Sequence, residues 1–477
     1  MKQPIRIGTI VLFLSILYMM GCSQAVPEEN TQTAVEKTHE KSSIERKANE
    51  PEHTEEKPGS EEFQDATEPF EQIVETATPS EKDTKPNHVY RHGLPLGSGK
   101  AEGLSEAKLE KLKERAREES SSALIVLKNG KLITETYFGQ KDMPLVAMSA
   151  SKSLVSLTIG ILLNEGKISS IDMKMAQVFT EWKGTPKEKI TLYQMLTHTS
   201  GLETLRTGTK KVNGQWTKGQ ISDGLKDPLK ESPDTIFRYN NRAVDLLALF
   251  VGRVAKKPLD VYLQDKLFTP MGIKGAYWMK DADGVPMGAG ELFIRPIDLA
   301  KVGLLLLQKG IWKDKRLIAE KWIQMSWAAS KRNPHCGLLW WRRALHNTYK
   351  LTKEILEQWE KSGLDAKYVT KLKGIVGKTF TLDEYRRALM ASLGNDNAAI
   401  RKLDSIIKSG GLFAQILPKG KLLYTAEGWL GQFLAIDPEK QLVAVRMRRP
   451  TREDYQSSQY KNTYPTFTRD VHGLTLP

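Results

Sequence analysis

A serine and a lysine three residues apart carry the clearest chemistry in the sequence. Ser149-Ala150-Ser151-Lys152 stands just before an apolar run that begins at Leu154. In a helix, residues three apart lie on one face, so the Lys152 amine would lie next to the Ser149 hydroxyl. A partly apolar site lowers the pKa of a lysine, and the neutral amine can then take the serine proton as a general base. The pair therefore predicts a nucleophilic serine.

The position of this pattern matters more than the pattern itself. Three further Ser-x-x-Lys copies lie in charged segments, at Ser105/Lys108, Ser405/Lys408 and Ser458/Lys461. Only the copy at Ser149 precedes a helix whose residues are apolar enough to be buried. A helix N-terminus also directs N–H groups toward a developing oxyanion, which favours the same copy.

A tyrosine and an asparagine form the second element. Tyr239 and Asn241 stand two residues apart, just before the apolar run Ala243–Val254. Both side chains can face one cleft, where Tyr239 would share a proton with Lys152 and protonate the leaving group. Asn241 would hold a substrate amide. Taken alone, the two residues fit structural roles better, Asn241 as a helix cap and Tyr239 in packing.

Further landmarks resemble those of a known family. Met148–Ser153 and Tyr239-x-Asn241 resemble the first two motifs of the serine β-lactamase-related superfamily, in the branch of class C β-lactamases, D-alanyl-D-alanine carboxypeptidases and esterases. Three other segments resemble family segments and fall in the right order: Gln194–Leu202, Leu267–Ile273 and Asp298–Ala300. The resemblance implies an acyl-enzyme on Ser149, with Lys152 as base and Tyr239 as proton shuttle. We expect no cofactor and no metal.

The third motif departs from the family pattern. β-Lactam-processing members carry Lys or His, then Thr or Ser, then Gly, whereas this chain reads Ala426-Glu427-Gly428-Trp429. Gly428 aligns, and the Trp429 N–H would complete an oxyanion hole with the N–H of Ser149. Ala426 and Glu427 supply neither the cation nor the hydroxyl that would hold a β-lactam or D-alanine carboxylate.

The run from Gly428 to Gln432 is more similar to the 6-aminohexanoate-dimer hydrolases and related esterases. This resemblance favours hydrolysis of an ester or amide, in a small molecule or in the cell envelope. Two alternatives stay open: a penicillin-binding D,D-carboxypeptidase or β-lactamase, and a non-catalytic envelope-binding lipoprotein.

Strands from both ends of the chain must position these residues. Ala123–Lys128 and Lys131–Phe138, joined by Asn129-Gly130, predict one hairpin, and Gln432–Ile436 with Leu442–Met447 predict another. Mostly helical patterns lie between them. We therefore expect an α+β fold, with one antiparallel sheet formed by both chain ends plus an inserted helical domain. The resemblance implies a β-lactamase/DD-peptidase-like architecture.

Residues 345–411 have a different pattern from their surroundings. Four short amphipathic helices are expected there: Lys353–Lys361, Asp365–Leu372, Leu382–Leu393 and Ala398–Ser409. We interpret the stretch as a helical insertion in the hydrolase domain 88–477, and expect it to shape access to the site.

The N-terminus predicts export. Ile7–Gly21 holds fifteen residues without a charge, too few for a spanning helix of ~20 residues but suited to a signal peptide. The following Cys22 makes residues 1–21 resemble a bacterial lipoprotein signal, with Cys22 lipidated. Residues 22–87 are polar and acidic and predict a disordered tether. We expect an extracytoplasmic protein anchored to the bacterial cell membrane.

Charge is distributed unevenly along the chain. The net charge is +14, of which −10 falls in residues 22–85 and +2 in residues 1–21, leaving +22 for the remainder. Such a basic body favours anionic surroundings, and anionic wall polymers are possible partners. Because the chain is expected to be exported, we expect no nucleic-acid partner. Two cysteines are too few for a disulfide scaffold.

Overall fold

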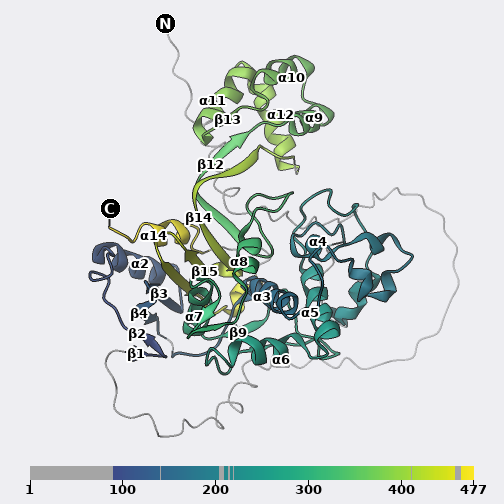
Figure 1. Ribbon diagram of the computed structural model, residues 1–477. Coiled ribbons are helices and arrows are strands. Elements are labelled where there is room, and N and C mark those ends of the chain that lie inside the picture. Colours follow the sequence, from purple (N-terminus) through teal and green to yellow (C-terminus); the bar gives the residue numbers. More distant parts are fainter. Residues whose placement is uncertain are drawn as a thin grey trace, which may run out of the picture. The chain divides into compact units, whose positions relative to one another are not determined.

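A seven-stranded antiparallel sheet joins both ends of the chain in the computed structural model (Figure 1). Its strand order is β13-β12-β14-β15-β16-β3-β4. The strands are β3 (Ala123–Lys128), β4 (Lys131–Tyr137), β12 (Trp341–Lys350), β13 (Thr379–Phe380), β14 (Gln415–Gly428), β15 (Gln432–Asp437) and β16 (Leu442–Met447). Both predicted hairpins are present, and β16 pairs with β3. The expected α+β arrangement is confirmed.

The structure describes residues 90–139, 141–203, 209–212, 215–218, 220–409, 411–456 and 463–476. The predicted signal peptide, Cys22 and the acidic tether lie outside these residues. Four shorter pairings or sheets accompany the central sheet. They are β1–β2 (Tyr90–Arg91, Leu94–Pro95), β5–β9–β8 (Leu145–Val146, Leu292–Ile294, Tyr277–Trp278), β6–β7 (Thr209–Val212, Gln215–Lys218) and β10–β11 (Ile311–Trp312, Lys315–Arg316).

The strand alternation explains how the sheet is covered on both faces. Successive side chains of a strand point to opposite faces. In β3, Leu124 and Val126 join a core with α2 (Glu106–Glu118) and α14 (Phe467–His472), whereas Ile125 and Leu127 join the larger core of the helical side. All four side chains are fully buried or nearly so. The sheet is therefore the middle of a layered arrangement.

The larger core holds the helices that carry the candidate chemistry. The remaining helices outside the insertion are α3 (Ser151–Asn164), α4 (Leu192–Leu196), α5 (Asn241–Ala255), α6 (Leu259–Leu263), α7 (Pro296–Leu307), α8 (Glu320–Trp327) and α13 (Arg452–Gln456). Helix α7 packs closely on the sheet: a Cβ at Gly303 would lie 2.6 Å from side-chain atoms of Leu434 and Val443. The absence of a side chain at Gly303 permits this approach.

The insertion has a hydrophobic core of its own. Strands β12 and β14 stay paired as far as Lys350 and Gln415, and the helices begin beyond them (Figure 1). They are α9 (Lys353–Lys361), α10 (Ala366–Leu372), α11 (Leu382–Leu393) and α12 (Asn397–Lys408), so the four predicted helices are confirmed. Trp359 is fully buried among them and donates its indole N–H to the carbonyl of Leu412. Residues 345–350, expected within the helical insertion, belong instead to strand β12.

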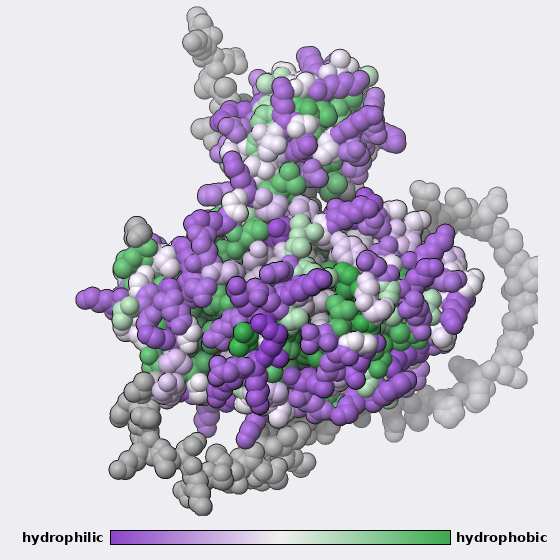
Figure 2. Space-filling model, viewed as in Figure 1, coloured by the Kyte–Doolittle hydropathy of each residue, from purple (hydrophilic) through white to green (hydrophobic). Residues whose placement is uncertain are grey.

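Hydrophilic residues cover most of the surface visible in Figure 2, with smaller hydrophobic areas between them. Among the described residues, no helix has both the length and the apolar character needed to cross a lipid bilayer.

Candidate active site

The nucleophile candidate lies in a tight turn at the start of α3. Ser149 is part of the 3₁₀ turn Met148–Ala150, and Met148 has a positive φ of 48°, a conformation that a non-glycine residue adopts at a cost. The hydroxyl of Ser151 donates to the carbonyl of Met148 at 2.6 Å and accepts the N–H of Leu292 at 3.3 Å. The turn is therefore held from within α3 and from β9.

Lys152 lies where the helix periodicity predicts. Its Nζ donates to the Ser149 Oγ at 2.8 Å and also to the carbonyl oxygen of Ala289. The side chain is almost completely buried, and this burial lowers the pKa of Lys152 to about 7, against the opposing influence of Asp245 and Glu291. A lysine with such a pKa is substantially neutral at neutral pH and can accept a proton.

Tyr239 contacts the same serine. Its hydroxyl hydrogen-bonds the side chain of Ser149, and Nζ of Lys152 lies 5.0 Å from the centre of its ring. Burial raises the pKa of Tyr239 well above its usual value. The phenol is therefore protonated at neutral pH, which leaves Lys152 as the better base and Tyr239 as a proton donor.

His198 supports the loop that carries Tyr239. Its ring packs on the Tyr239 ring with centroids 4.7 Å apart, and its Nδ1 accepts the N–H of Asn240 at 3.2 Å. Burial, with the nearby charge of Lys152, lowers the pKa of His198 to about 3. The imidazole is therefore neutral in the working range and acts as a packing and hydrogen-bonding group.

Asn240, and not Asn241, caps helix α5. The Asn240 side chain accepts the N–H of Ala243 at 3.0 Å and donates to the carbonyl of Leu202 at 2.9 Å. The alternative interpretation of Asn241 as the cap is thus wrong by one residue. Asn241 is the first residue of α5, exposed and outside the set of pocket-lining residues. The structure does not bring it to Ser149, and its substrate contact stays a prediction.

Glu427 of the third motif faces the pocket and is paired with an arginine. Arg343 of β12 donates from Nε and Nη2 to the two carboxylate oxygens at 2.6 and 2.5 Å, and the Thr425 hydroxyl donates to Oε1 at 2.5 Å. The Arg343 guanidinium lies over the ring of Trp341 at 5.0 Å. A neutralised carboxylate–guanidinium pair thus occupies the position where the family places a cation and a hydroxyl.

These groups line one narrow pocket. Its walls are formed by Ser149, Lys152, Ser153, His198, Tyr239, Cys336, Leu339, Trp341 and Glu427. Burial raises the pKa of the Cys336 thiol to about 12, so this thiol is neutral. Of the adjacent tryptophans, Trp341 lines the pocket and Trp340 is fully buried in the core.

The end of β14 lies against the nucleophile turn. A Cβ at Gly428 would lie 2.5 Å from the carbonyl oxygen of Ala147 and 3.0 Å from the N of Ser149, so only glycine fits. The next residue, Trp429, packs its ring on Tyr455 at 5.5 Å. The close approach of Gly428 to the nucleophile turn brings the main chain of the predicted oxyanion hole next to the backbone N of Ser149.

A buried arginine fixes the turn that follows Trp429. Leu430 has a φ of 65°, and the fully buried Arg446 donates to the carbonyls of Leu430 at 2.5 Å and Gly431 at 2.8 Å. Its other donors reach Ser121, Thr463 and the carbonyl of Glu119. Main-chain and hydroxyl oxygens thus satisfy Arg446, which holds this turn in one conformation.

Two residues of the site were missed by the sequence analysis. Arg343 lies 84 positions from its partner Glu427, and no local pattern links the two. Asp245 is a carboxylate inside the apolar run of α5, where it is buried. A charge within an apolar helix is the signal that would have found it.

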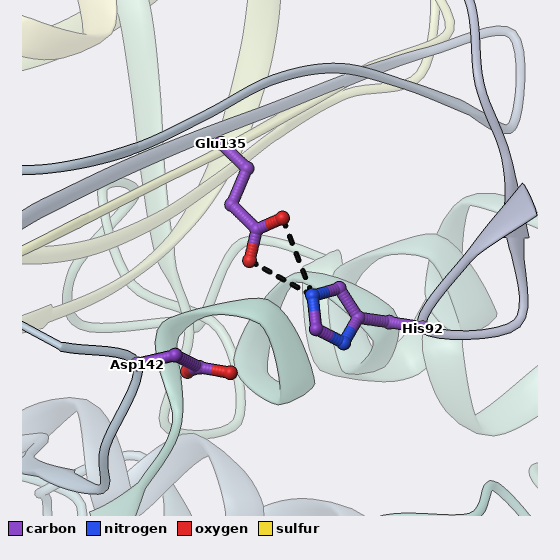
Figure 3. A group of neighbouring side chains, drawn as sticks. All are labelled: His92, Glu135 and Asp142. Carbon is purple, nitrogen blue, oxygen red and sulfur yellow. Dashed lines mark hydrogen bonds and ion pairs between the residues drawn. The ribbon is translucent and has the colours of Figure 1, made fainter. Parts of the chain in front are cut away.

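A second cluster of potential ligands lies outside the pocket. Side-chain atoms of His92, Glu135 and Asp142 lie within 4.8 Å of one another, and Figure 3 shows His92 facing both oxygens of Glu135. Arg91 also pairs with Glu135 at 3.0 Å and Arg295 with Asp142 at 3.2 Å. These guanidinium charges already compensate the carboxylates and would repel a cation. We describe the cluster as an ion-pair network that ties β1 to β4.

Comparison with known proteins adds independent information. Residues 109–453 match the protein-family model described as Beta-lactamase. The chain is similar to a Bacillus subtilis (strain 168) protein provisionally named penicillin-binding protein PbpX, at 24% identity over 41% of this chain and 57% of the relative. It is also similar to 6-aminohexanoate-dimer hydrolase of Paenarthrobacter ureafaciens, at 24% identity over 47% of this chain and 62% of the relative. The chain thus spans less than two thirds of either relative.

A solved structure shares the fold. A Bacillus anthracis protein, provisionally named 6-aminohexanoate-dimer hydrolase, superposes with a TM-score of 0.53 and 17% sequence identity. The match covers 82% of this chain and 88% of the other. The expected β-lactamase-like architecture is confirmed.

Proposed function

The chain belongs to the beta-lactamase family and is a serine hydrolase, and from this premise we propose that it cleaves an ester or amide through an acyl-enzyme on Ser149. The observation that carries the proposal is the 2.8 Å hydrogen bond between the Lys152 amine and the Ser149 hydroxyl. It joins a buried lysine, whose pKa is lowered to about 7, to the one hydroxyl that Tyr239 also contacts.

The proposed acylation uses each of these groups once. Lys152 takes the Ser149 proton while Oγ attacks the substrate carbonyl carbon. The oxyanion that forms accepts hydrogen bonds from the N–H groups of Ser149 and Trp429. Tyr239 then gives its proton to the leaving alcohol or amine and recovers one from the Lys152 ammonium. Water attacks the acyl-enzyme by the reverse route and releases the acid.

The pair formed by Arg343 and Glu427 favours esters and amides over penicillins. A penicillin carries a carboxylate that needs a free cation or hydroxyl beside the nucleophile. Here the Arg343 charge is already matched by Glu427 at 2.5 Å, within a side-chain environment that leaves Glu427 only 10% exposed. A substrate carboxylate would therefore meet a cation that is already paired and would lie close to the Glu427 carboxylate, which disfavours it.

The natural setting that we propose is the cell envelope. The signal-like segment before Cys22 supports a lipoprotein, and the charge of +22 on residues 86–477 supports contact with anionic wall polymers. Metabolic labelling with an alkyne fatty acid tests the anchor. Labelling that disappears in Cys22→Ala is expected, and equal labelling of both proteins would reject it.

Covalent labelling followed by intact mass spectrometry tests the activity. The full-length protein would be exposed to a fluorophosphonate and to a fluorescent penicillin, with Ser149→Ala as the control. We expect one fluorophosphonate adduct that is absent from the variant, and no penicillin adduct. Penicillin labelling would instead support the alternative of a penicillin-binding D,D-carboxypeptidase or β-lactamase. Labelling by neither probe would favour the non-catalytic envelope-binding alternative.

A further inference from the structure

We propose that Asp245 is a positioning residue for the reaction, holding the Lys152 amine against Ser149 through the main chain of Ala289. The inference rests on the proposed function, because it assigns a task to a residue that does not itself touch the substrate. It concerns the hydrogen bond between Lys152 and Ala289, a residue that is not among those lining the pocket.

Ala289 links Asp245 to Lys152 by two hydrogen bonds, one on its N–H and one on its carbonyl oxygen. An Asp245 carboxylate oxygen accepts the Ala289 N–H at 2.7 Å, and the carbonyl of the same residue accepts a hydrogen bond from the Lys152 Nζ. Asp245 is 1% exposed and Lys152 is 3% exposed. A displacement of Ala289 would therefore move the acceptor that orients the amine.

The segment that carries Ala289 packs on helix α5. At Gly288 a Cβ would lie 3.0 Å from the Cβ of Ala248 and 3.1 Å from the carbonyl oxygen of Val244, so the segment lies directly on α5. The indole N–H of Trp278 holds the carbonyl of Gly290 at 2.9 Å, and Glu291 has a φ of 60°. From α5, the carboxylate of Asp245 accepts a hydrogen bond from the Ala289 N–H of this segment.

The same carboxylate acts on the charge of Lys152. Asp245 and Glu291 favour the ammonium form and oppose the effect of burial on the pKa of Lys152. The other titratable groups that line the pocket are His198, Tyr239, Cys336 and Glu427. At neutral pH the first three are uncharged, because burial lowers the pKa of His198 and raises those of Tyr239 and Cys336. Arg343 pairs with Glu427.

Two variants separate the geometric effect from the electrostatic one. Asp245→Asn keeps an oxygen that can accept the Ala289 N–H but removes the negative charge. Because that charge stabilises the ammonium, its removal lowers the pKa of Lys152, and the neutral base persists to lower pH. Asp245→Ala removes the acceptor as well, so Ala289 and the amine lose their alignment.

The experiment measures the rate constant of fluorophosphonate labelling of the full chain from pH 4.5 to 9. For the unchanged protein the rate should rise with pH through about 7, the pKa of Lys152. In Asp245→Asn we expect this rise to move down by about one pH unit, with the upper plateau within about threefold of the original. In Asp245→Ala we expect the plateau to fall by about 10- to 100-fold.

Asp281→Asn is the matched control. Asp281 is also buried, and its carboxylate accepts the N–H groups of Ile221, Asp283 and Val285. It is not among the charges that act on Lys152, so its loss should leave the pH midpoint unchanged. Thermal unfolding of each variant separates a change in folding from a change at the site.

Each outcome decides a different point. An unchanged plateau in Asp245→Ala would overturn the inference about Asp245, and a plateau that falls equally in Asp245→Asn would overturn it as well, because that variant keeps the acceptor for the Ala289 N–H. If Asp245→Ala fails to fold, the plateau of Asp245→Leu, whose side chain has a similar size and no acceptor, decides in its place. Absence of Ser149-dependent labelling in the unchanged protein would instead overturn the proposed function.

Discussion

The two walls of the pocket differ in how far they follow the family pattern. The wall made by the start of α3 carries Ser149 and Lys152, joined by a 2.8 Å hydrogen bond, with Tyr239 on the same hydroxyl. The wall made by β12 and β14 carries Arg343 and Glu427 in place of the family's cation and hydroxyl. In the function that we propose, the first wall carries the groups that form and break bonds, and the second wall contacts the substrate.

If the proposed function is right, the residues for catalysis and those for substrate selection lie on different secondary-structure elements. The proposed catalytic groups lie on helix and loop segments, and they contact one another directly. The Arg343–Glu427 pair depends on the register of two strands, in which Arg343 lies opposite Leu423 and Glu427 opposite Phe433. One wall can therefore change while the other keeps its arrangement.

Lys152→Ala should give the largest effect, because it removes the base from the first wall. We expect the rate of fluorophosphonate labelling to fall by at least about 10³-fold, with little change in the far-UV circular dichroism. Lys408→Ala is the matched control, since Ser405 and Lys408 repeat the same spacing on α12. Labelling that persists in Lys152→Ala would show that the first wall does not supply the base.

Gly428→Ala tests where the two walls touch. The new Cβ would overlap the carbonyl oxygen of Ala147 and the Cβ of Met148, at 2.5 and 2.8 Å. The nucleophile turn must move, and we expect labelling to fall by about 10²- to 10³-fold, as for the loss of an oxyanion-hole donor. Gly252→Ala, with nothing within 4 Å of its Cβ, should keep full activity; equal losses in both would contradict this contact.

Glu427→Gln sharpens the comparison on the second wall. Removing the carboxylate removes the negative charge that faces Arg343, so an anionic ester should gain relative to a neutral one. We expect the ratio of kcat/KM for mono-p-nitrophenyl succinate to that for p-nitrophenyl butyrate to rise about tenfold, equivalent to one favourable charge contact. The gain should vanish in the double variant with Arg343→Gln. An unchanged ratio would remove Glu427 from substrate selection.

Trp359→Ala should have the smallest effect on activity, because it lies beyond both walls. The buried indole fills the core of the insertion, and its removal should destabilise that core by about 3–5 kcal/mol. Hydrogen exchange should accelerate in α9–α12 while labelling of Ser149 stays within about twofold. A large loss of labelling would assign the insertion a part in forming the pocket.

Local patterns were sufficient to predict Lys152 beside Ser149, whereas the place of Tyr239 was predicted from the family resemblance. The helix period places Lys152 beside Ser149, and the two hairpins and four insertion helices follow from alternation and spacing. The helix cap at Asn240 was missed because two adjacent asparagines satisfy the same preference. Only the hydrogen bonds to Ala243 and Leu202 distinguish them.

The second wall could not be predicted, because its contacts are distant in sequence. Arg343 and Glu427 meet only through the pairing of β12 with β14, on either side of the whole insertion. The extension of β12 to Lys350 was not predicted for the same reason, because the strand that pairs with it begins only at Gln415. No pattern near Asp245 in the sequence predicts its hydrogen bond with Ala289, which lies on another segment 44 positions away.

The pairing of β16 with β3 has a consequence for the biogenesis of the enzyme. Leu442 lies opposite Lys128, so the centre of the sheet closes only when a very long loop has formed. Topologies with such high contact order fold slowly. A nascent chain that stops before Met447 lacks the strand on which α7 packs and that joins the two hairpins. We therefore expect the active site to form only after the C-terminal hairpin has been synthesised, and chains that end before Met447 to be inactive.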